Sequence, residues 1–473
     1  YEIFDCDWSS DVCSSDLGKI VIAGTFSRVG GVTRNRLARL NADGTVDLGF
    51  NTNVLGTVNN LTLNSNGQVM IQGDFINLQP GDAIMIGGNF TKVGGFSTNN
   101  FAVLNVDGTA SGTFRPSPNA PVYAIATQTD GKVILGGAFT TVVGGNRRGI
   151  ARFNTNGNLD TAFSADTDGQ VNAVEVQSDG KILLGGSFNT VGGVARTNLA
   201  RLNTDGSVDG SYAPNPNGTV NAIMLQADGS ALVGGAFTVI GGTARSRVAR
   251  LSSTGSVDSF NPGANDEVFG LAPEVNGQVV IVGAFTTLGG TTRNRAALVN
   301  ADGTVDSAFN PSANGTVRAV SVQQDGRVIV GGTFSQIGGQ ARNALARLAA
   351  AATYSTSMSV DEDLAVVTWT RNGAGPEIAS ASFEYSTDNR RWFSMGTASR
   401  VGTTNTWRVT GQSLPSTTAF YVRATGRTML SQNSSEGLVA DVWEFPPRPL
   451  ITSSLSTSGA LGSSFFYAIG KIG

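Results

Sequence analysis

A repeat with a period of 49 residues is the feature that most limits how this chain can fold. Residues 131–139 read G-K-V-I-L-G-G-A-F, and close variants of this motif recur through the first 350 residues. The phenylalanine that ends the motif recurs in steps of 49, 15, 49, 49, 49, 48 and 49 residues: Phe26, Phe75, Phe90, Phe139, Phe188, Phe237, Phe285 and Phe334. A fixed period of this length is typical of stacked repeat units, which bury their apolar faces only against one another.

Each unit contains four short β-rich runs separated by Asp-Gly, Asn-Gly or Gly-Gly pairs. In one unit we expect strands a, b, c and d to begin at Val171, Lys181, Leu199 and Val208. The Asp-Gly pairs fit tight hairpin turns, and no stretch shows the sustained 3.6-residue apolar spacing of a helix. Four antiparallel strands in roughly 40–50 residues is the size of one propeller blade. The sequence therefore predicts an all-β chain with a β-propeller over residues 18–350.

Two features of strand b have expected packing roles. Gly185 and Gly186 lie inside the strand, where glycine normally weakens a sheet, so they indicate a bulge or a close approach between neighbouring blades. Phe188 follows them and is the largest apolar side chain of the unit. We expect it to pack between sheets and to bind no cofactor.

These motifs resemble the delta-60 repeat, a propeller-forming repeat of large bacterial proteins. The resemblance covers Gly18 to about Ala350 and implies a secreted or cell-surface protein, with no established chemistry. Counting Phe75 and Phe90 as one irregular unit gives seven blades, whereas eight with one degenerate blade, or a deletion of about 34 residues, are alternatives. The first unit lacks its own strand a and the last lacks an obvious strand d, so ring closure stays open.

The first 17 residues are interpreted as an artefact. Residues 7–17 read D-W-S-S-D-V-C-S-S-D-L and are similar to the in-frame translation of a sequencing-library adapter, although a genuine polar N-terminus is the alternative. Both cysteines, Cys6 and Cys13, lie in this segment, so no disulfide is expected. The segment holds five of the 35 acidic residues and no basic one, which leaves 32 basic against 30 acidic residues. The native N-terminus, with any signal peptide, is expected to be missing.

Composition changes after Ala350. Glycine becomes rarer, and every tryptophan outside the first segment lies here: Trp369, Trp392, Trp407 and Trp443. Strands are expected at 366–370, 383–386 and 419–424, with Leu414 in the loop before the last one. A buried early tryptophan and a late Tyr-x-Arg-Ala strand resemble the fibronectin type III domain, an immunoglobulin-like β-sandwich, over residues 351–445. Residues 446–473 resemble the start of a further immunoglobulin-like domain, cut short.

The residue content argues against most enzyme chemistry. Histidine is absent and no cysteine lies outside the first segment, so the common nucleophile–base pairs and zinc sites are excluded. No phosphate-binding loop or dinucleotide motif occurs, and we expect no cofactor and no membrane span. Near-neutral charge and few lysines argue against nucleic acid. Asp266 and Glu267 are the irregular acidic pair, but neighbouring residues of an extended strand face opposite ways.

Three Asn-x-Asp-Gly segments are similar to the later part of a calcium-binding loop. Their aspartates are Asp43, Asp205 and Asp302. The position that normally supplies the first calcium ligand holds Arg39, Arg201 or Leu298, so we favour plain turns and expect no metal.

Arginine supplies the candidate binding residues. Six units carry an arginine after the Gly-Gly pair that follows strand b, and in a propeller these loops share one face: Arg34, Arg147, Arg196, Arg245, Arg293 and Arg342. We predict that this set binds an anionic partner, with loop or structural arginines as the alternative. A second set lies in strand c, and four of its members are expected to pair with an aspartate of strand d: Arg39, Arg152, Arg201, Arg250 and Arg347.

The sequence thus favours a non-enzymatic, extracellular binding or scaffold protein of the secreted or cell-surface class. The propeller face is expected to engage a glycan or protein partner, an anionic one by preference. A carbohydrate-active propeller enzyme is the alternative, and an acid pair outside the repeat positions would favour it.

Overall fold

The computed structural model describes most of the chain between residues 10 and 447: residues 10–14, 19–41, 43–64, 83–105, 107–112, 114–323, 326–349, 355–373, 375, 377–402, 404–428 and 438–447. Within these residues the regular structure is β-strand, apart from one 3₁₀ turn, η2, at Val275–Gly277. The predicted all-β fold is therefore confirmed.

Seven antiparallel sheets follow one another in the described residues up to 348, and each runs outward in chain order from its first strand. In chain order the sheets are β1 (Ser10–Ser14), β2 (Ile20–Gly24) and β5 (Leu37–Leu40); β6 (Val54–Asn64), β7 (Ala83–Val93), β9 (Phe101–Leu104) and β10 (Ala110–Ser111); β11 (Val122–Thr127), β12 (Val133–Gly137) and β15 (Ile150–Phe153); β16 (Gln170–Val176), β17 (Ile182–Ser187) and β20 (Leu199–Leu202); β21 (Val220–Leu225), β22 (Ala231–Gly235) and β25 (Val248–Leu251); β26 (Val268–Pro273), β27 (Val279–Gly283) and β30 (Ala296–Val299); and β31 (Val317–Val322), β32 (Val328–Gly332) and β35 (Leu345–Leu348).

The predicted strand d is wrong in most units, because it is reduced to a single bridge. In the unit of β16, Val208 pairs with Leu202 and the pairing then stops. The next residue, Asp209, accepts hydrogen bonds from Arg201 and from the backbone N–H of Ser211, and a turn to Tyr212 follows. The aspartate thus ends the strand by capping a turn. Single bridges of this kind also join Leu40 to Val46, Phe153 to Leu159, Leu251 to Val257 and Val299 to Val305.

Small hairpins project between the second and third strands of the sheets. In β18 (Thr190–Val191) and β19 (Val194–Ala195) the turn is Gly192-Gly193, with φ of 56° and 77°. Two consecutive left-handed residues make the tight hairpin turn that the twist of a β-ribbon favours, which explains the Gly-Gly pair. The equivalent pairs are β3 (Arg28–Val29) and β4 (Val32–Thr33), β13 (Thr141–Val142) and β14 (Gly145–Asn146), β23 (Val239–Ile240) and β24 (Thr243–Ala244), β28 (Thr287–Leu288) and β29 (Thr291–Thr292), and β33 (Gln336–Ile337) and β34 (Gln340–Ala341), while β8 (Phe96–Ser97) pairs with β7.

The glycine pair in the second strand serves both expected purposes. Pairing between β16 and β17 shifts register between Val171 and Ala173, opposite Gly186 and Gly185. A Cβ on Gly186 would collide with a backbone oxygen of β16, and a Cβ on Gly185 would lie 2.6 Å from Cγ1 of Val220 in the next sheet. The predicted bulge and the predicted close approach are thus both confirmed.

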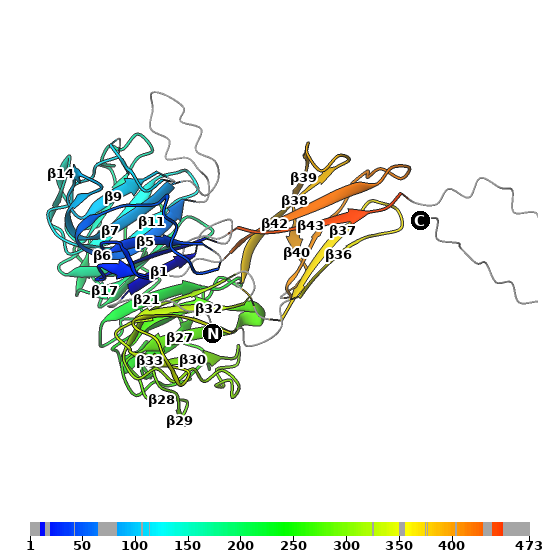
Figure 1. Ribbon diagram of the computed structural model, residues 1–473. Helices are drawn as coiled ribbons and strands as arrows, with labels where there is room; N and C mark the ends of the chain where they lie inside the picture. The colour runs from blue at the N-terminus through cyan, green and yellow to red at the C-terminus, as the bar shows by residue number, and fades with distance from the viewer. Residues whose placement is uncertain are drawn as a thin grey trace, which may run out of the picture.

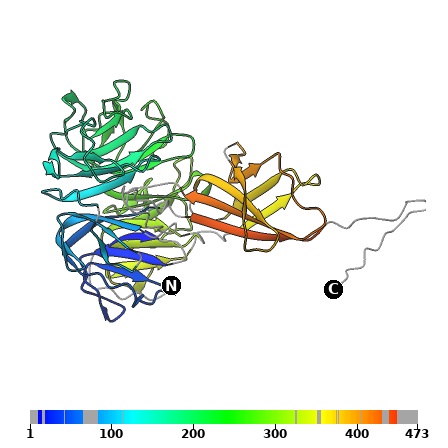
Figure 2. The same ribbon diagram turned by 90° about the horizontal axis from the view of Figure 1, so that it is seen from above.

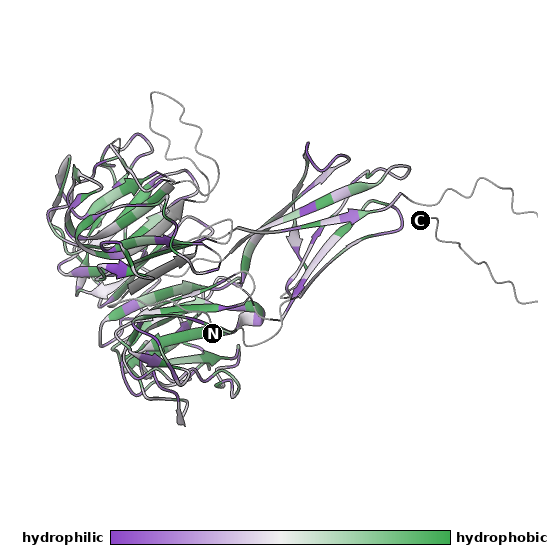
Figure 3. Ribbon diagram, viewed as in Figure 1, coloured by the Kyte–Doolittle hydropathy of each residue, from purple (hydrophilic) through white to green (hydrophobic). Residues whose placement is uncertain are grey.

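Apolar side chains from adjacent sheets form shared cores. Phe188 is buried in one cluster with Ile134 of the preceding sheet and Leu184 of its own, as expected for packing between sheets. Hydrophobic residues follow the strands of every sheet in Figure 3. The first and last sheets also share a core, in which Ile22 and Phe26 pack with Ile329. In Figure 2 the blue strands of the first sheet lie beside the yellow-green strands of the last.

The first strand of each sheet contacts the first strands of the two sheets beside it. β1 completes this sequence because it contacts both β6 and β31. Residues 10–14 lie in the expected adapter segment, yet their backbone pairs with β2 along its whole length. Backbone pairing needs no particular side chains, so an open strand edge accepts almost any extended segment. The origin of residues 1–17 stays a prediction.

One sheet spans the irregular 15-residue step. Its first strand, β6, precedes the step and pairs with β7, which follows it and carries the buried Phe90. Phe75 and the predicted strand at 68–75 lie outside the described residues.

The C-terminal part forms two four-stranded antiparallel sheets around one core (Figure 1). The first contains β36 (Ser355–Val360), β37 (Val367–Asn372), β41 (Thr406–Val409) and β40 (Ser399–Arg400), and the second contains β39 (Phe393–Thr397), β38 (Ile378–Ser386), β42 (Phe420–Thr428) and β43 (Leu438–Phe445). Trp369 is fully buried and donates from its indole to Asp441 at 2.8 Å. The three predicted strands are confirmed, and Leu414 is buried ahead of the third. Residues 448–473, most of the predicted further domain, lie outside the described residues.

The glycine contacts predict a measurable difference between two substitutions. Gly185→Ala forces Val220 of the neighbouring sheet to move, and we expect it to lower the free energy of unfolding by about 1–3 kcal/mol. Gly210→Ala is the matched control, because nothing lies within 4 Å of its added methyl group. Urea unfolding of both variants measures the difference, and equal stability of the two would contradict the close approach.

Candidate functional site

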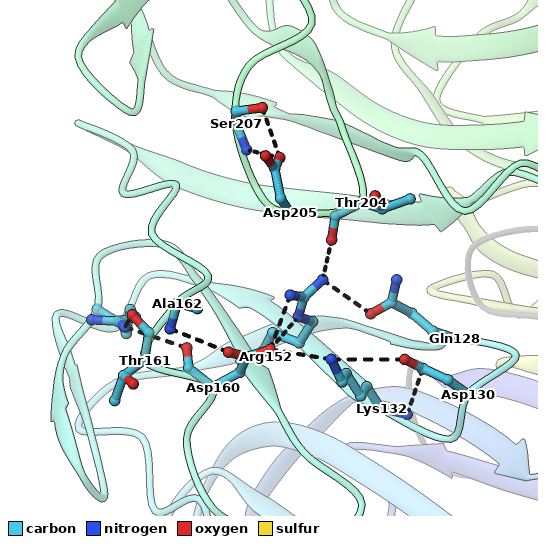
Figure 4. Close-up of polar contacts among 11 residues, drawn as sticks. Gln128, Asp130, Lys132, Arg152, Asp160, Thr161, Ala162, Thr204, Asp205 and Ser207 are labelled. Carbon is cyan, nitrogen blue, oxygen red and sulfur yellow. Dashed lines mark hydrogen bonds and ion pairs between the residues drawn. The ribbon is translucent and has the colours of Figure 1, made fainter.

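An arginine of the third strand holds each of several sheets to the next. Arg152 donates from Nε to Asp160 at 2.9 Å and from Nη1 to the carbonyl of Thr204, in the next sheet, at 2.5 Å (Figure 4). Its guanidinium also lies over the ring of Phe163, 4.3 Å from the centroid. Lys132 is the second cation beside Asp160, at 3.5 Å. The guanidinium of Arg152 is therefore engaged in contacts within the protein, and its role is structural.

The same arrangement recurs in other units, and all four predicted pairs between an arginine of strand c and an aspartate are confirmed. Arg201 pairs with the buried Asp209 at 2.9 Å, lies over Tyr212 and donates to Ser253 of the next sheet. The other pairs are Arg39 with Asp47 and Arg250 with Asp258, stacked on Phe50 and Phe260. Arg347 is buried, and burial lowers its pKa.

The cations keep these aspartates ionised. Partial burial raises the pKa of Asp47, but hydrogen bonds from Lys19 and Arg39 outweigh this effect and lower the pKa to about 2. The pKa of Asp160 is lowered in the same way, because Arg152 and Lys132 outweigh its burial. A carboxylate that is already neutralised by two cations offers little to a ligand.

The six arginines predicted to bind an anion also contact the protein itself. Arg196 is buried, and its two terminal nitrogens donate to the carbonyls of Ala195, Asp209 and Gly210. Arg34, Arg147, Arg245 and Arg293 repeat these bonds to the preceding residue and to the aspartate 13 positions later, and Arg342 makes the first of them. Their geometry matches the structural alternative, and anion binding by them stays a prediction.

The three aspartates weighed as calcium ligands form turns, as expected. Asp43 accepts from the backbone N–H and the hydroxyl of Thr45, at 2.9 and 2.7 Å. Asp205 does the same with Ser207, and Asp302 with Thr304. Among the described residues no three metal-binding side chains gather at one place. No helix in this part of the chain is long and apolar enough to cross a membrane.

A different set of residues is the better candidate for a binding site, because its members share one strand position and differ in their side chains. In six sheets the first strand carries one extra residue at the bulge. In β16, for example, Val171 lies opposite Gly186 and Ala173 lies opposite Gly185, so the residue between them has no partner in the register. We call these six residues the inner ring: Asn59, Tyr123, Asn172, Asn221, Phe269 and Arg318. Repetition fixes their backbone, whereas their side chains differ from sheet to sheet.

The side chains beside an inner-ring residue show why it is left out of the core. Val171 and Val174 pack on Gly136 of the preceding sheet, and Ala173 joins the core shared with the following sheet. Asn172, the inserted residue, instead contacts Asn221, the inserted residue of the next first strand, at 3.4 Å. Inner-ring residues therefore meet one another where the first strands face each other.

Contacts continue in the same direction around the inner ring. Asn221 donates to Glu267 at 2.9 Å and to the carbonyl of Val268 at 3.1 Å. The guanidinium of Arg318 lies over the ring of Phe269, 5.0 Å from its centroid. Arg318 is exposed, and no described residue accepts a hydrogen bond from it. In contrast to the predicted arginines, it keeps its donors available.

The irregular acidic pair contributes one residue to this region. Glu267 accepts the hydrogen bond from Asn221, whereas Asp266 accepts from the backbone N–H of Glu267 at 2.8 Å. The expectation that the two carboxylates do not act together agrees with these separate partners.

Glu175 is a buried acid that sequence reasoning missed. It lies in β16, and burial raises the pKa of its carboxyl to about 8. The equivalent positions of five other units hold Thr62, Ala126, Met224, Ala272 and Ser321, so Glu175 is the one ionisable residue of this set. The inner ring was missed for a related reason, since only the register of the sheets shows that these differing residues share one bulge position.

The arginine contacts predict unequal effects of two equivalent substitutions. The side chains of Arg201 and Asp209 are 7% and 8% exposed, whereas those of Arg250 and Asp258 are 20% and 35% exposed. We expect Arg201→Ala to lower the free energy of unfolding by about 2–4 kcal/mol, because it removes a buried ion pair, the contact with Tyr212 and the bond to Ser253 of the next sheet. Lys181 remains paired with Asp209 at 2.9 Å and limits the loss. Arg250→Ala should cost about 1–2 kcal/mol, since water reaches its partner. Equal losses in urea unfolding would refute this account of burial.

Comparisons with known proteins bear on the repeat. Six segments match the family model described as "Domain of unknown function (DUF5122) beta-propeller": residues 18–50, 128–163, 177–212, 226–260, 276–309 and 323–350. No curated protein matches. A gluconolactonase from Xanthomonas campestris has a TM-score of 0.31 and 13% identity over 68% of this chain and 94% of its own. A Bacteroides fragilis protein has a TM-score of 0.31 and 8% identity over 60% and 84%. Scores this low carry no argument about function. The matched segments cover most of the repeated units, and the chain is a β-propeller repeat protein.

Proposed function

We propose that this chain is a non-enzymatic extracellular binding protein whose inner ring engages a glycan. The observation that carries the proposal is the inner ring itself, in which one bulge position repeats while its side chain changes. The fold needs the inserted residue only as an extra backbone unit, so its side chain can be chosen to suit a ligand.

The chemistry of the inner ring suits a sugar. Asn172 and Asn221 offer amide donors and acceptors to hydroxyl groups, and Glu267 adds a carboxylate acceptor. Tyr123 and Phe269 offer aromatic faces to the apolar C–H side of a sugar ring. A few oriented polar groups beside aromatic rings are typical of small-ligand sites.

Arg318 favours an acidic sugar over a neutral one. Its guanidinium is exposed, and the Phe269 ring beneath it fixes its position without using its N–H groups. A guanidinium forms two parallel hydrogen bonds with a carboxylate, which adds strength and direction. A uronic acid or another carboxylated sugar is therefore the preferred ligand class.

The finer fold assignments belong to this proposal. Seven successive sheets and the contacts of β1 with β6 and β31 support a seven-bladed ring of delta-60-like repeats. The order β39-β38-β42-β43 opposite β36-β37-β41-β40 supports a fibronectin type III-like sandwich. Repeats and sandwiches of these kinds imply a bacterial protein that is secreted or at the cell surface, where the sandwich spaces the propeller from its anchor.

A second function, cleavage of the glycan, has one observation in its favour. Glu175 is a buried carboxyl whose raised pKa, about 8, keeps it protonated at neutral pH, as a general acid requires. It lies three residues beyond Asn172 on the same strand, about 10 Å along the chain.

Binding of the full chain to a polysaccharide array tests the proposal. We expect salt-sensitive binding to carboxylated glycans, and Phe269→Ala should weaken it at least about tenfold, the loss expected for a central aromatic contact. Arg318→Gln should weaken binding to acidic glycans more than to neutral ones.

Arg342→Gln is the matched control, since among the described residues its guanidinium donates to the neighbouring carbonyl of Ala341 alone. Loss of binding with Arg342→Gln, and none with Phe269→Ala, would move the site to the predicted arginine set. Sugar release that Glu175→Gln abolishes would replace the binding protein by the enzyme. No glycan binding at all would refute the proposal.

A further inference from the structure

One turn of the propeller departs from the repeat and contacts the C-terminal sheets. Four other units have an Asp-Gly pair between their first and second strands, such as Asp179-Gly180. Between β26 and β27 the turn reads Glu-Val-Asn-Gly instead, and residues 275–277 form η2. Figure 1 shows the C-terminal sheets directly beside the propeller sheets.

Three hydrogen bonds join this turn to the C-terminal sheets. The backbone N–H of Val275 donates to the carbonyl of Gly375 at 2.8 Å, and the N–H of Gly375 donates back to Oε2 of Glu274 at 2.7 Å. Asn405 donates from its amide to Asn276 at 2.7 Å. The bonded residues are about 100 or more positions apart in the chain, so the turn is a specific contact between the two units.

The junction buries charged side chains from both units. Glu274 is 2% exposed, Arg371 is 1% exposed and Glu377 is 5% exposed. Arg400 pairs with Glu377, and Arg371 acts electrostatically on both carboxyls. One oxygen of each carboxyl, Oε1 of Glu274 and Oε2 of Glu377, has no hydrogen-bond partner among the described residues. A buried carboxylate with an unpaired oxygen is costly, whereas a protonated carboxyl is much less so.

We propose that this junction is a proton-controlled latch, in which the C-terminal sheets dock on the propeller while Glu274 carries a proton and separate when it ionises. The groups that face Glu274 are Arg371 and the N–H groups of Gly375 and Val275. Those that face Glu377 are Arg400, Arg371 and the N–H of Gly277. Separation exposes both carboxyls to water, where each ionises at its ordinary pKa.

The direction of the pH effect follows from burial. Burial raises the pKa of Glu274 to about 7 from its ordinary value of 4.5, against the lowering effects of the N–H groups and Arg371. Burial also raises the pKa of Glu377, against Arg400 and Arg371. The docked state therefore binds protons more tightly than the separated state. Docking is strongest below pH 4.5 and weakens on the order of a hundredfold as pH rises to 7.

The latch lies away from the inner ring. Phe269 is near the start of β26, whereas Glu274 follows its end, so the two are about 17 Å apart along the strand. Separation of the sheets changes how the propeller is held relative to the C-terminal sheets. This inference is independent of the proposed ligand.

Amide exchange of the full chain at pH 5 and pH 7.5 tests the latch. After correction for the intrinsic exchange rate, protection of the Val275 and Gly375 amides should fall on the order of a hundredfold at the higher pH, while a peptide covering β17 stays constant. Small-angle X-ray scattering should show a larger radius of gyration at pH 7.5.

Glu274→Gln should remove most of the pH response and leave only the part that Glu377 contributes, because a neutral amide cannot ionise. Glu362→Gln, an exposed acid of the same sheets, is the matched control and should respond like the wild type. If Glu274→Gln does not fold, Glu377→Gln should still reduce the response. A wild-type junction equally protected at both pH values, or a glutamine variant that keeps the full response, would overturn the latch.

Discussion

A glycine pair in the second strand sets the geometry on which most of the propeller depends, and the strands β2 and β27 keep only its second glycine. Gly186 admits the bulged backbone of the first strand, and Gly185 lets Val220 of the next sheet approach to a distance that no other residue type allows. The bulge adds one residue to the first strand, and the close approach brings that residue near its counterpart in the next sheet. One constraint therefore produces both the tight packing of the sheets and the inner ring.

In several sheets an arginine of the third strand completes the frame. Arg152 joins an aspartate of its own sheet, an aromatic ring and a carbonyl of the next sheet, so its removal affects two units at once. A buried ion pair is weak evidence for net stability, but it is strongly direction-dependent and fixes how the two sheets meet. A rigid frame is what allows differing side chains at one repeated position to act together as a site.

Much of the frame could be predicted from the repeat, because a period of 49 residues, the glycine pair and the Arg–Asp spacing each follow from local physical requirements. The length of strand d could not be predicted, because the strand pairing ends where the Asp209 carboxylate accepts from Arg201 and caps a turn. The predicted arginine set was conspicuous because it repeats, and residues that repeat mostly serve the frame. Phe269 and Arg318 were overlooked because they do not repeat, and only the register shift shows that they share a position. A role for Glu274 could not be predicted either, because it depends on a hydrogen bond from Gly375, about 100 residues away in the sequence.

A crystal structure of the full chain with a bound carboxylated oligosaccharide is the most direct test of the central claim, that the residues inserted at the bulge form the ligand site. The account predicts a sugar ring against Phe269, with its carboxylate paired to Arg318 and its hydroxyl groups bonded to Asn172 or Asn221. A sugar bound at Arg34 and its equivalents, on the hairpins, or on the C-terminal sheets would contradict it.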